Sequence, residues 1–407
     1  MQPHLVCVGG EDHALRIPFL LALRDRGFEV TAVSSGDGAA FARRGLSHHP
    51  YAFDRFGSIG GAWGAIRQLR RLMKQLKPDI VQSFDTKPNL LMPLASRGAV
   101  PLIRTINGLG WVFSSTEPRA RALRPVFCGL QRLVSRWTAL TVFQNQDDQA
   151  FFAQRGLLGP GGRDRLIVSS GIDPDAFRQA QQGGPSPDAL RNQLGLGTAE
   201  IVLFVGRLTR QKGIPTLLDA IPTVLAQRKH ARFVLVGPRE SEGPFAVDQA
   251  EIDELAPHAI ALGPRSDVPA LLGMADVFAF PTEYREGVPR VLLEAGLAGL
   301  PIVATRMPGC SDIVEDGQNG YLVKPRDPDA LAARIIDLLR DPIGAKAMGT
   351  RARSLVRERF NLARVVEQYC DAYARVLSGS ATDEAEDTQA RRVTETGHAQ
   401  KLGVRRP

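Results

Sequence analysis

The stretch Glu283-Tyr-Arg-Glu-Gly-Val-Pro-Arg-Val-Leu-Leu-Glu294 decides how this chain is organised. It follows Asp276-Val-Phe-Ala-Phe-Pro281, an apolar run bounded by proline, which predicts a buried strand of a parallel sheet. Gly287 and Pro289 then interrupt the chain, and the residues from Arg290 to Gly299 have the composition and spacing of a short helix. A strand, a loop and a helix in this order form the repeating unit of an α/β fold.

The loop of this unit carries a carboxylate to the start of the helix. Glu286 precedes the helix, where free N–H groups and the positive end of the helix dipole favour anions. Glu294 follows eight residues later, about two turns along the helix. These positions suit a ligand with an anionic middle and hydroxyl groups at its ends, which is the layout of a nucleotide sugar. An ordinary strand–loop–helix unit with two solvated glutamates accounts for the same residues.

The segment resembles the signature of family-4 glycosyltransferases, in which seven residues separate two glutamates, here Glu286 and Glu294. Residues 284–290, Tyr-Arg-Glu-Gly-Val-Pro-Arg, are similar to the subset of bacterial enzymes that extend lipid-linked glycans. The resemblance covers about residues 3–376. It implies the GT-B architecture, an α/β fold of two doubly wound Rossmann-like domains that face each other across a cleft.

The same resemblance implies an activity. The donor is expected to be a nucleotide-diphospho-sugar, UDP-linked and carrying a hexose or an N-acetylhexosamine. The acceptor is expected to be a saccharide linked to a lipid diphosphate of the undecaprenyl type, in the biosynthesis of cell-surface polysaccharide or glycan. Retention of configuration without a protein nucleophile is also implied by the family and not by these residues.

The length of 407 residues exceeds what one hydrophobic core covers, so we expect two domains. We expect residues 1–180 to form an N-terminal acceptor-binding domain and residues 188–360 a C-terminal nucleotide-sugar-binding domain. Residues 181–187, rich in Gln, Gly, Pro and Ser, are the expected linker. Residues 361–377 resemble the family helix that crosses back to the first domain. Mixed charge without apolar periodicity predicts a disordered tail over residues 378–407.

Composition narrows the class of protein. Apolar residues make up 43% and charged residues 23% of the chain, as in ordinary globular proteins. The four cysteines are scattered without paired spacing, which predicts free thiols in a reducing compartment and no zinc site. Strand-like residues from Leu5 leave no room for a signal peptide, and no apolar run approaches the ~20 residues of a membrane helix. We therefore expect a cytoplasmic protein.

The net charge of +8 is unevenly distributed. Residues 1–178 contain 23 lysines and arginines against 14 acidic residues, a net charge of +9. Nucleic acid, anionic lipid or a phosphorylated acceptor would each complement this excess, but no nucleic-acid-binding signature accompanies it. Arginines alternate with apolar residues over Arg119–Trp137, the pattern of a helix at a membrane surface. We expect this helix to hold the protein on the inner face of the cell membrane, and a helix packed on its own sheet fits nearly as well.

The first half also contains candidate ligand-binding residues. Leu5-Val-Cys-Val-Gly-Gly10 reads as a strand that ends in glycines, so Gly10 either approaches the donor phosphate or only turns the chain. The spacing Gly-x-Gly-x-x-Gly of dinucleotide-binding folds is absent. Lys87 and Asn107 follow two further predicted strands, at the edge where open α/β sheets bind ligands, and are candidates for the acceptor. A solvated lysine in a turn accounts for Lys87 equally well. Many family members carry a histidine near Asn107, so its absence argues against a histidine-assisted step.

The second half contains the donor candidates. Ile201-Val-Leu-Phe-Val-Gly206 opens the second domain, and Arg207 and Lys212 flank the start of the next helix, where a diphosphate would meet two cations. Taken alone, this pair could also be surface charge. Arg265 lies where the family holds the nucleotide base. The resemblance assigns the donor site to Gly10, Arg207, Lys212, Arg265, Glu286, Gly287, Val288, Pro289, Val291 and Glu294, with Glu286, Arg207 and Lys212 at the reaction centre.

No metal ion or other cofactor is expected. Two Asp-Pro-Asp triplets, at residues 173–175 and 327–329, match an Asp-x-Asp metal motif, but a central proline favours a turn or a helix start. Three other functions remain open from the residues. A UDP-sugar epimerase would convert the donor without an acceptor, a nicotinamide oxidoreductase would need the missing glycine fingerprint, and a non-catalytic membrane scaffold would not need the carboxylates and cations.

Overall fold

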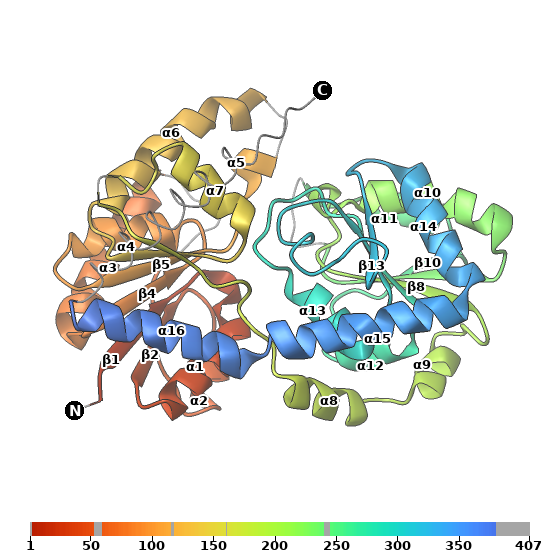
Figure 1. The fold of residues 1–407 in the computed structure, drawn as a ribbon, viewed down its shortest axis with the longest axis horizontal. Coiled ribbons are helices and arrows are strands. Elements are labelled where there is room, and N and C mark those ends of the chain that lie inside the picture. Colours follow the sequence, from red (N-terminus) through yellow and green to blue (C-terminus); the bar gives the residue numbers. More distant parts are fainter. Residues whose placement is uncertain (1, 53–58, 115–117, 160, 240–244, 380–407) are drawn as a thin grey trace, which may run out of the picture.

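The computed structural model describes residues 2–52, 59–114, 118–159, 161–239 and 245–379. Two α/β domains lie side by side (Figure 1). Most of the predicted tail over residues 378–407 lies outside the described residues. Within the described ranges, no helix combines the length and the apolar composition needed to cross a bilayer. All four cysteines are free thiols.

The first domain is built on a parallel sheet whose described strands follow the order β3-β2-β1-β4-β5-β6-β7. The strands are β1 (His4–Val8), β2 (Glu29–Ser34), β3 (Ser47–Pro50), β4 (Ile80–Phe84), β5 (Leu102–Ile106), β6 (Leu140–Phe143) and β7 (Asp164–Leu166). Strands β4, β5 and β6 are buried along their whole length, as expected for strands covered on both faces. β3 was not predicted, because its sequence, Ser-His-His-Pro, lacks an apolar pattern. A strand at the edge of a sheet, as β3 is, needs fewer apolar side chains.

The second domain has a parallel sheet with the described order β10-β9-β8-β11-β12-β13. Its strands are β8 (Glu200–Val205), β9 (Ala231–Val236), β10 (Ala259–Ala261), β11 (Val277–Phe280), β12 (Ile302–Thr305) and β13 (Gly320–Val323). Both orders step away from a central strand in two directions, which is the doubly wound arrangement. The expected fold class is therefore confirmed, including the strand predicted ahead of Glu283.

Helices cover both faces of the first sheet. One face packs against α1 and α16, the other against α3, α4 and α6. In Figure 1, α6 lies on the upper side of this domain and α1 and α16 on the lower side. The helical segments of this domain are η1 (Glu11–Arg16), α1 (Ile17–Asp25), α2 (Ala39–Ala42), α3 (Ile59–Leu76), α4 (Pro88–Ser96), α5 (Trp111–Ser114), α6 (Pro118–Ser135) and α7 (Gln146–Gln154).

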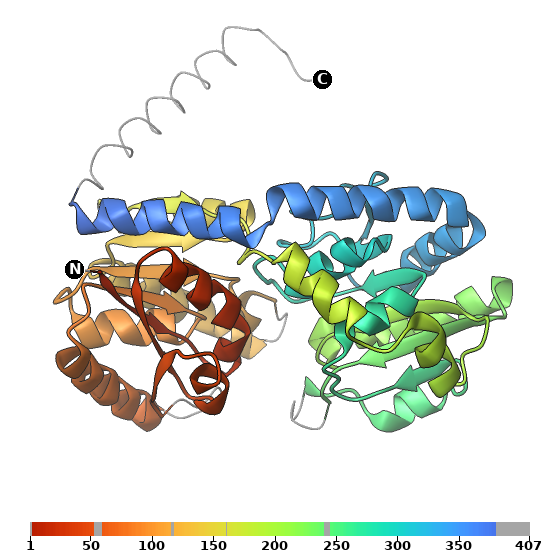
Figure 2. The same cartoon turned by 90° about the horizontal axis from the view of Figure 1, so that it is seen from below.

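The remaining helical segments follow residue 173. They are α8 (Pro174–Gln182), α9 (Pro187–Gln193), η2 (Arg210–Lys212), α10 (Ile214–Gln227), α11 (Gln249–Asp253), α12 (Val268–Met274), α13 (Arg290–Ala298), α14 (Pro328–Arg340), α15 (Pro342–Arg359) and α16 (Leu362–Leu377). α15 and α16 follow one another across both domains (Figure 2). Helix α16 buries Val365, Tyr369 and Tyr373 in the core of the first domain, so the C-terminal segment crosses back as the resemblance implied.

The chain crosses between the domains earlier than the expected linker at 181–187. Ile172 and Phe177 already belong to the core of the second domain, and α8 packs on α12 and α13. Ser186 caps α9, so the Ser–Pro pair read as a linker in fact starts a helix. The two crossing segments meet where Ile172 N donates to Phe360 O at 2.9 Å and Leu362 N donates to Ile172 O at 2.9 Å.

Gly171 makes this crossing possible. Its φ is +75°, and a Cβ atom there would lie 2.8 Å from Leu362 Cα and 3.2 Å from Val365 Cβ. We therefore expect Gly171→Ala to lower the free energy of unfolding by about 2–5 kcal/mol, through backbone strain and overpacking together. Gly195 also has a positive φ, +65°, but open space around it.

Gly195→Ala is thus a matched control, which should lower the free energy of unfolding by only ~1–2 kcal/mol. Thermal unfolding midpoints of the two variants provide the comparison. Equal shifts for both variants would show that the crossing does not constrain residue 171.

Candidate functional site

The site is centred on an ion pair at the carboxyl edge of the second sheet. Lys212 Nζ lies 2.5 Å from Glu286 Oε1, and both side chains are largely withdrawn from solvent. Lys212 also lies over the rings of Phe280 and Tyr284, at 5.4 and 5.8 Å from their centroids. A lysine ammonium has three donors, so this pair leaves Lys212 protons for a ligand. The structure thus brings together two of the three residues predicted at the reaction centre.

Two helices begin beside this pair. Helix α10 starts after Gly213 and helix α13 starts after Pro289, and neither flanking residue supplies a side-chain cap. The first N–H groups of a helix have no partner within the helix and present partial positive charge. Gly213 has φ +73°, and its absent Cβ would lie 1.8 Å from Pro281 O, so only glycine lets the start of α10 approach the end of β11. Lys212 therefore directly precedes one anion-favouring helix start, and its partner Glu286 precedes the other.

The loop that carries Glu286 also contacts the first domain. Gly287 N donates to Asn107 O at 2.8 Å, and Asn145 Nδ2 donates to Glu286 O at 3.2 Å. Arg285 N donates to Ser114 Oγ at 2.6 Å. These bonds join the signature loop to the loops that follow β5 and β6. The side chain of Glu286 therefore lies at the meeting point of the two domains.

A buried ion pair reinforces this interdomain contact. Arg285 Nε donates to Asp148 Oδ1 at 2.6 Å, and the Asp148 side chain is fully buried. Burial raises the pKa of Asp148, while the Arg285 guanidinium and the amide of Asn145 act to lower it. A buried carboxylate needs such partners to stay ionised, so the pair links the position of Arg285 to the first domain.

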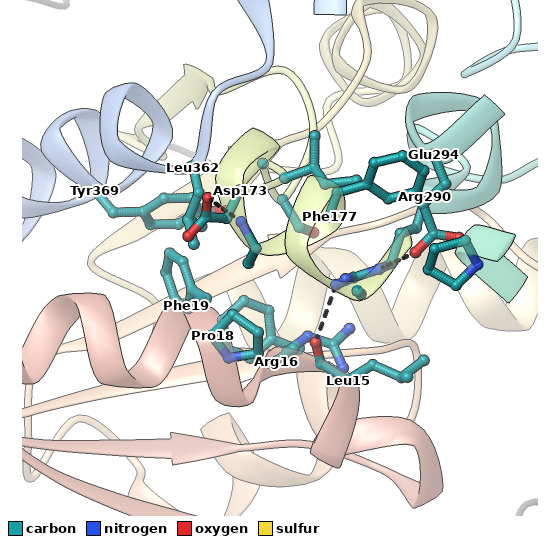
Figure 3. Close-up of a pocket in the computed structure, with 17 residues that line it drawn as sticks. Leu15, Arg16, Pro18, Phe19, Asp173, Phe177, Arg290, Glu294, Leu362 and Tyr369 are labelled. Atoms are coloured by element: carbon teal, nitrogen blue, oxygen red, sulfur yellow. Dashed lines mark hydrogen bonds and ion pairs between the residues drawn. The ribbon is translucent and has the colours of Figure 1, made fainter. Parts of the chain in front are cut away.

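Glu294 faces a different part of the interdomain space. With Arg290 it lines a cavity of about 160 Å³ that both domains enclose, together with Leu15, Phe19, Phe177 and Leu362 among others. Arg290 Nε donates to Glu294 Oε1 at 2.9 Å, and Arg290 also reaches across to Leu15 O at 3.3 Å (Figure 3). The two glutamates of the signature thus face different surroundings: a lysine and two helix ends for Glu286, an apolar cavity for Glu294.

Asp85 organises the opposite wall of the site. Its carboxylate accepts hydrogen bonds from Gly10 N at 3.0 Å, Arg16 Nη2 at 2.8 Å and Asn107 Nδ2 at 2.8 Å. Burial acts to raise the pKa of Asp85, but Arg16, the Gly10 N–H and Asn107 outweigh it and lower the pKa to about 2. Asp85 is therefore a carboxylate that ties together the loops after β1, β4 and β5.

Other predicted residues occupy less central positions. Arg207 lies at the end of β8, half-buried, and Lys87 lies at the start of α4 beyond β4. Arg265 makes a bidentate ion pair with Asp267 at 2.8 and 2.6 Å, so a nucleotide base would meet this pair and not a free guanidinium. Val288 and Val291 are partly buried against the core of the second domain, and Pro289 is buried.

Comparisons with known proteins agree with this geometry. The family model described as Glycosyltransferase Family 4 matches residues 19–161, and the one described as Glycosyl transferases group 1 matches residues 187–355. The chain belongs to glycosyltransferase family 4. A curated N,N'-diacetylbacillosaminyl-diphospho-undecaprenol alpha-1,3-N-acetylgalactosaminyltransferase of Campylobacter jejuni is 27% identical to it, over 91% of this chain and 97% of that protein.

Two further matches support the assignment. A GDP-mannose-dependent alpha-(1-6)-phosphatidylinositol monomannoside mannosyltransferase of Mycolicibacterium smegmatis is 31% identical, over 65% of this chain and 68% of that protein. The crystal structure of Anabaena HepE with UDP and glucose superposes with a TM-score of 0.73, at 21% identity, over 91% of this chain and 99% of that one. The protein is thus a glycosyltransferase of the GT-B type.

Sequence reasoning missed several residues of this glycosyltransferase's site. Arg285 stands inside the quoted signature, and Asp148 and Asp85 each follow a predicted strand, but no role was given to them. Their partners lie 137 residues away for Arg285–Asp148 and 69 for Arg16–Asp85, so no local pattern reveals the pairing. A carboxylate just beyond a buried strand was the available signal, since ligand sites form at that edge.

Helix α6 only partly matches its prediction. Ala120, Phe127 and Val134 are buried against the domain, so the helix packs on its own sheet. Four apolar side chains nevertheless remain exposed, namely Leu123, Val126, Leu130 and Leu133. They recur at spacings of three and four residues, which places them along one stripe of the helix. The helix thus packs on its own sheet, and contact of its exposed stripe with a membrane stays a prediction.

No group of acidic, histidine or cysteine side chains suited to a metal ion occurs among the described residues. The Asp-Pro-Asp triplets start helices: Asp173 caps α8 and Asp327 caps α14 through side-chain acceptors. The interpretation of these triplets as helix starts is confirmed.

The Arg285–Asp148 pair gives a prediction about pH. In Arg285→Met the buried carboxylate loses its cation, so we expect the free energy of unfolding to fall by roughly 2–3 kcal/mol, below the ~3–5 of a fully buried pair. The folded-state pKa of Asp148 should rise further above its unfolded value of 3.8. The variant should then be most stable below about pH 4 and lose stability as the pH rises through the folded-state pKa.

Thermal unfolding between acidic and neutral pH measures this effect. Arg210→Met, which removes an exposed pair with Glu251, serves as the control and should change little at any pH. A pH profile of Arg285→Met parallel to that of the parent protein would contradict the assigned role of the pair.

Proposed function

We propose that this glycosyltransferase moves a hexose or N-acetylhexosamine from a UDP-sugar to a saccharide linked to a lipid diphosphate. The observation that carries the proposal is the Lys212–Glu286 pair, set between two uncapped helix ends and against the loops of the first domain. A cation and two helix N-termini suit a diphosphate. A carboxylate next to them suits the hydroxyl groups of the attached sugar.

The donor assignment rests on this chemistry and on the comparisons. Lys212 and Arg207 would neutralise the charge that grows on the leaving diphosphate, which lowers the barrier when the groups are positioned in advance. UDP is the nucleotide in the HepE structure, whereas the mycobacterial relative is named for GDP-mannose. We propose UDP first and GDP as the alternative. Glu294, at the rim of its cavity, would bind the ribose hydroxyls.

The acceptor would approach from the first domain. The Campylobacter relative, which this chain matches over nearly its full length, is named for a diphospho-undecaprenol acceptor. Lys87 and Asn107 lie in the loops after β4 and β5, where an acceptor would bring its hydroxyl to the sugar. Asn107 O already accepts a hydrogen bond from Gly287 N. This bond fixes the loop proposed to bind the acceptor against the loop proposed to bind the donor. Retention of configuration is proposed from the family alone.

We also propose that the protein works at the inner face of the cell membrane and is held there by Arg119–Trp137. The exposed stripe of α6 supports this contact. Two neighbouring aromatic side chains pack inside the domain: Trp137 lies by Gly98, and Phe113, in the segment before α6, lies between Phe127 and Phe151. Reversing charge at Arg121 and Arg136 should weaken binding to anionic vesicles more than reversing it at Arg132, which donates to Gly156 O and Arg155 O.

The transfer reaction itself tests the proposal. Purified protein is incubated with UDP- and GDP-linked sugars and with undecaprenyl-diphosphate-linked saccharides, and the lipid product is analysed by mass. A glycan longer by one sugar is the expected result. Donor conversion without any acceptor would favour an epimerase, and vesicle binding without donor binding would favour a scaffold.

Catalysis should need no divalent metal, because in the proposed complex a lysine, an arginine and two helix ends would supply the positive charge at the diphosphate. Transfer should continue in an excess of chelator. Complete loss of activity that magnesium or manganese restores would contradict this description of charge stabilisation.

The two glutamates should have separable effects. If Glu294 binds only the ribose, its contact is the same in the ground and transition states, so Glu294→Gln should weaken donor binding and leave turnover unchanged. A lost hydrogen bond to a charged group is worth ~1.5–3 kcal/mol, about 10- to 150-fold in affinity. Glu286→Gln should instead lower turnover with little change in donor affinity, since Glu286 is closer to the sugar that gains positive charge.

Calorimetric donor affinity and saturating turnover decide between these outcomes. Glu200→Gln is the control, because Glu200 pairs with Arg228 at the far end of β8 and should affect neither quantity. The roles are exchanged if Glu294→Gln lowers turnover alone and Glu286→Gln weakens binding alone. The stretch is scaffold if neither variant changes either quantity.

A further inference from the structure

Two buried threonines lie next to the Lys212–Glu286 pair. Thr282 follows the end of β11 by two residues, and Thr305 is the last residue of the neighbouring strand β12. Both are 0% exposed. Thr305 Oγ1 donates a hydrogen bond to Thr282 O at 2.5 Å, which continues the contact between the two strands beyond their last paired residues. Thr282 is therefore fixed to the edge of the sheet.

The hydroxyl group of Thr282 has a defined orientation. Thr282 Oγ1 accepts a hydrogen bond from Tyr284 N at 3.2 Å, and it lies 3.4 Å from Glu286 Oε1. A hydroxyl group has a single proton, a backbone N–H can only donate, and a carboxylate can only accept. Because Tyr284 N supplies its own proton, the proton of the Thr282 hydroxyl is directed at Glu286.

The two carboxylate oxygens of Glu286 have different surroundings. Oε1 accepts a hydrogen bond from Lys212 Nζ at 2.5 Å and a second one from Thr282 Oγ1. Oε2 has no hydrogen-bond partner among the residues that the structure describes. The side chain of Glu286 is 20% exposed. One oxygen is thus held by the protein, and the other is available to a ligand.

The backbone of the loop that carries Glu286 is fixed on both sides. Before it, Glu283 N donates to Gln211 O at 2.9 Å. After it, Gly287 N donates to Asn107 O at 2.8 Å. The freedom that remains to Glu286 lies in its side-chain torsions, and a long side chain loses much conformational entropy when it is held in one rotamer. The partners of Oε1 therefore decide where the carboxylate lies.

Lys212 and Thr282 are unequal partners. An O–H···O hydrogen bond is most favourable at about 2.7–2.8 Å, so Thr282, at 3.4 Å, is the weaker partner of Oε1. In the proposed donor complex, a diphosphate at the start of α10 would share the ammonium group of Lys212 and weaken its bond to Glu286. Hydrogen bonds at a reaction centre often shorten in the substrate complex. Thr282 would then be the donor that keeps Oε1 in place.

We propose that Thr282 is a positioning residue for Glu286 and that Thr305 holds Thr282 in the required place. While the diphosphate shares the charge of Lys212, the Thr282 hydroxyl retains Glu286 Oε1, and Oε2 binds the sugar that is transferred. The position of the carboxylate matters, because a displacement of about 1 Å can lower a rate ~100-fold. The inference rests on the proposed function, since it concerns the contact of Glu286 with the sugar.

The test compares saturating turnover with calorimetric donor affinity. Thr282→Val keeps the shape of the side chain and lacks the hydroxyl group. Its turnover should fall about 10- to 100-fold, as expected for a lost hydrogen bond to a charged group. Its donor affinity should change by less than about twofold, because Thr282 does not touch the donor. Thr282→Ser restores the hydroxyl group and should return turnover to within about threefold of the parent value.

Thr305→Val provides a second variant. It removes the hydrogen bond to Thr282 O and leaves the Thr282 hydroxyl in the chain. Turnover should fall less than in Thr282→Val, again without a change in donor affinity, because Thr305 acts one residue further from Glu286. This variant keeps the inference testable if Thr282→Val does not fold.

Two comparisons separate positioning from a general structural effect. In a Glu286→Ala background, Thr282→Val should change the residual turnover by less than about twofold, because the side chain through which Thr282 acts is absent. Thr31→Val is the matched control, since it removes a buried hydroxyl group of the first domain that lies 2.9 Å from His4 Nε2. It should lower the unfolding midpoint and leave turnover and donor affinity unchanged.

Four results would overturn the inference. They are an unchanged turnover of Thr282→Val, a parallel loss of turnover and donor affinity, a full further loss in the Glu286→Ala background, and a Thr282→Ser variant as slow as Thr282→Val. A parent protein that transfers no sugar would contradict the proposed function itself, and the inference with it. Transfer by the parent protein therefore distinguishes the two failures.

Discussion

The ion pair between Lys212 and Glu286 is the interaction on which the rest of the site depends. Gly213 lets the start of α10, and with it Lys212, approach the end of β11. The loop before α13 brings Glu286 to Lys212, and the pair forms. Each partner neutralises the other in a poorly solvated space, where an isolated charge would be costly. Under the proposed function, a diphosphate that arrives there would meet a lysine already positioned at the start of α10. The binding of an anion therefore requires little rearrangement of the protein.

The same loop connects this centre to the first domain, where we propose that the acceptor binds. Residues 285–287 bond to Ser114, Asn107, Asn145 and Asp148, while Asp85 fixes Asn107 from behind. The signature loop and the loops after β5 and β6 thus form one hydrogen-bonded unit, although they belong to separate domains; in the proposed function these loops would bind donor and acceptor. Preorganisation of this kind lowers a barrier by removing the need to align two reactants during the reaction.

The sequence predicted the parts of this arrangement that local patterns determine. Apolar runs bounded by glycine or proline located the buried strands, and the Glu286–Glu294 spacing identified the family. The crossing point was placed too late, because Ser186-Pro187 reads as a linker but caps a helix. The contact of Arg285 could not be predicted, since it depends on which carboxylate the fold brings within reach. The partner of Arg265 is Asp267, only two residues further on, so this pair was open to a local reading of the sequence. For α6, the pattern contained two apolar sets, and only packing shows which one stays exposed.

The central claim is that the protein recognises the diphosphate of its donor through Lys212 and the two helix ends. Calorimetric titration of uridine, UMP and UDP, with the guanosine series in parallel, tests this claim most directly. Affinity should rise steeply from nucleoside to diphosphate within the preferred series, and Lys212→Met should remove most of that rise while leaving the affinity for the nucleoside unchanged. A nucleoside that binds as tightly as its diphosphate, or a Lys212→Met variant that keeps the full rise, would contradict the account.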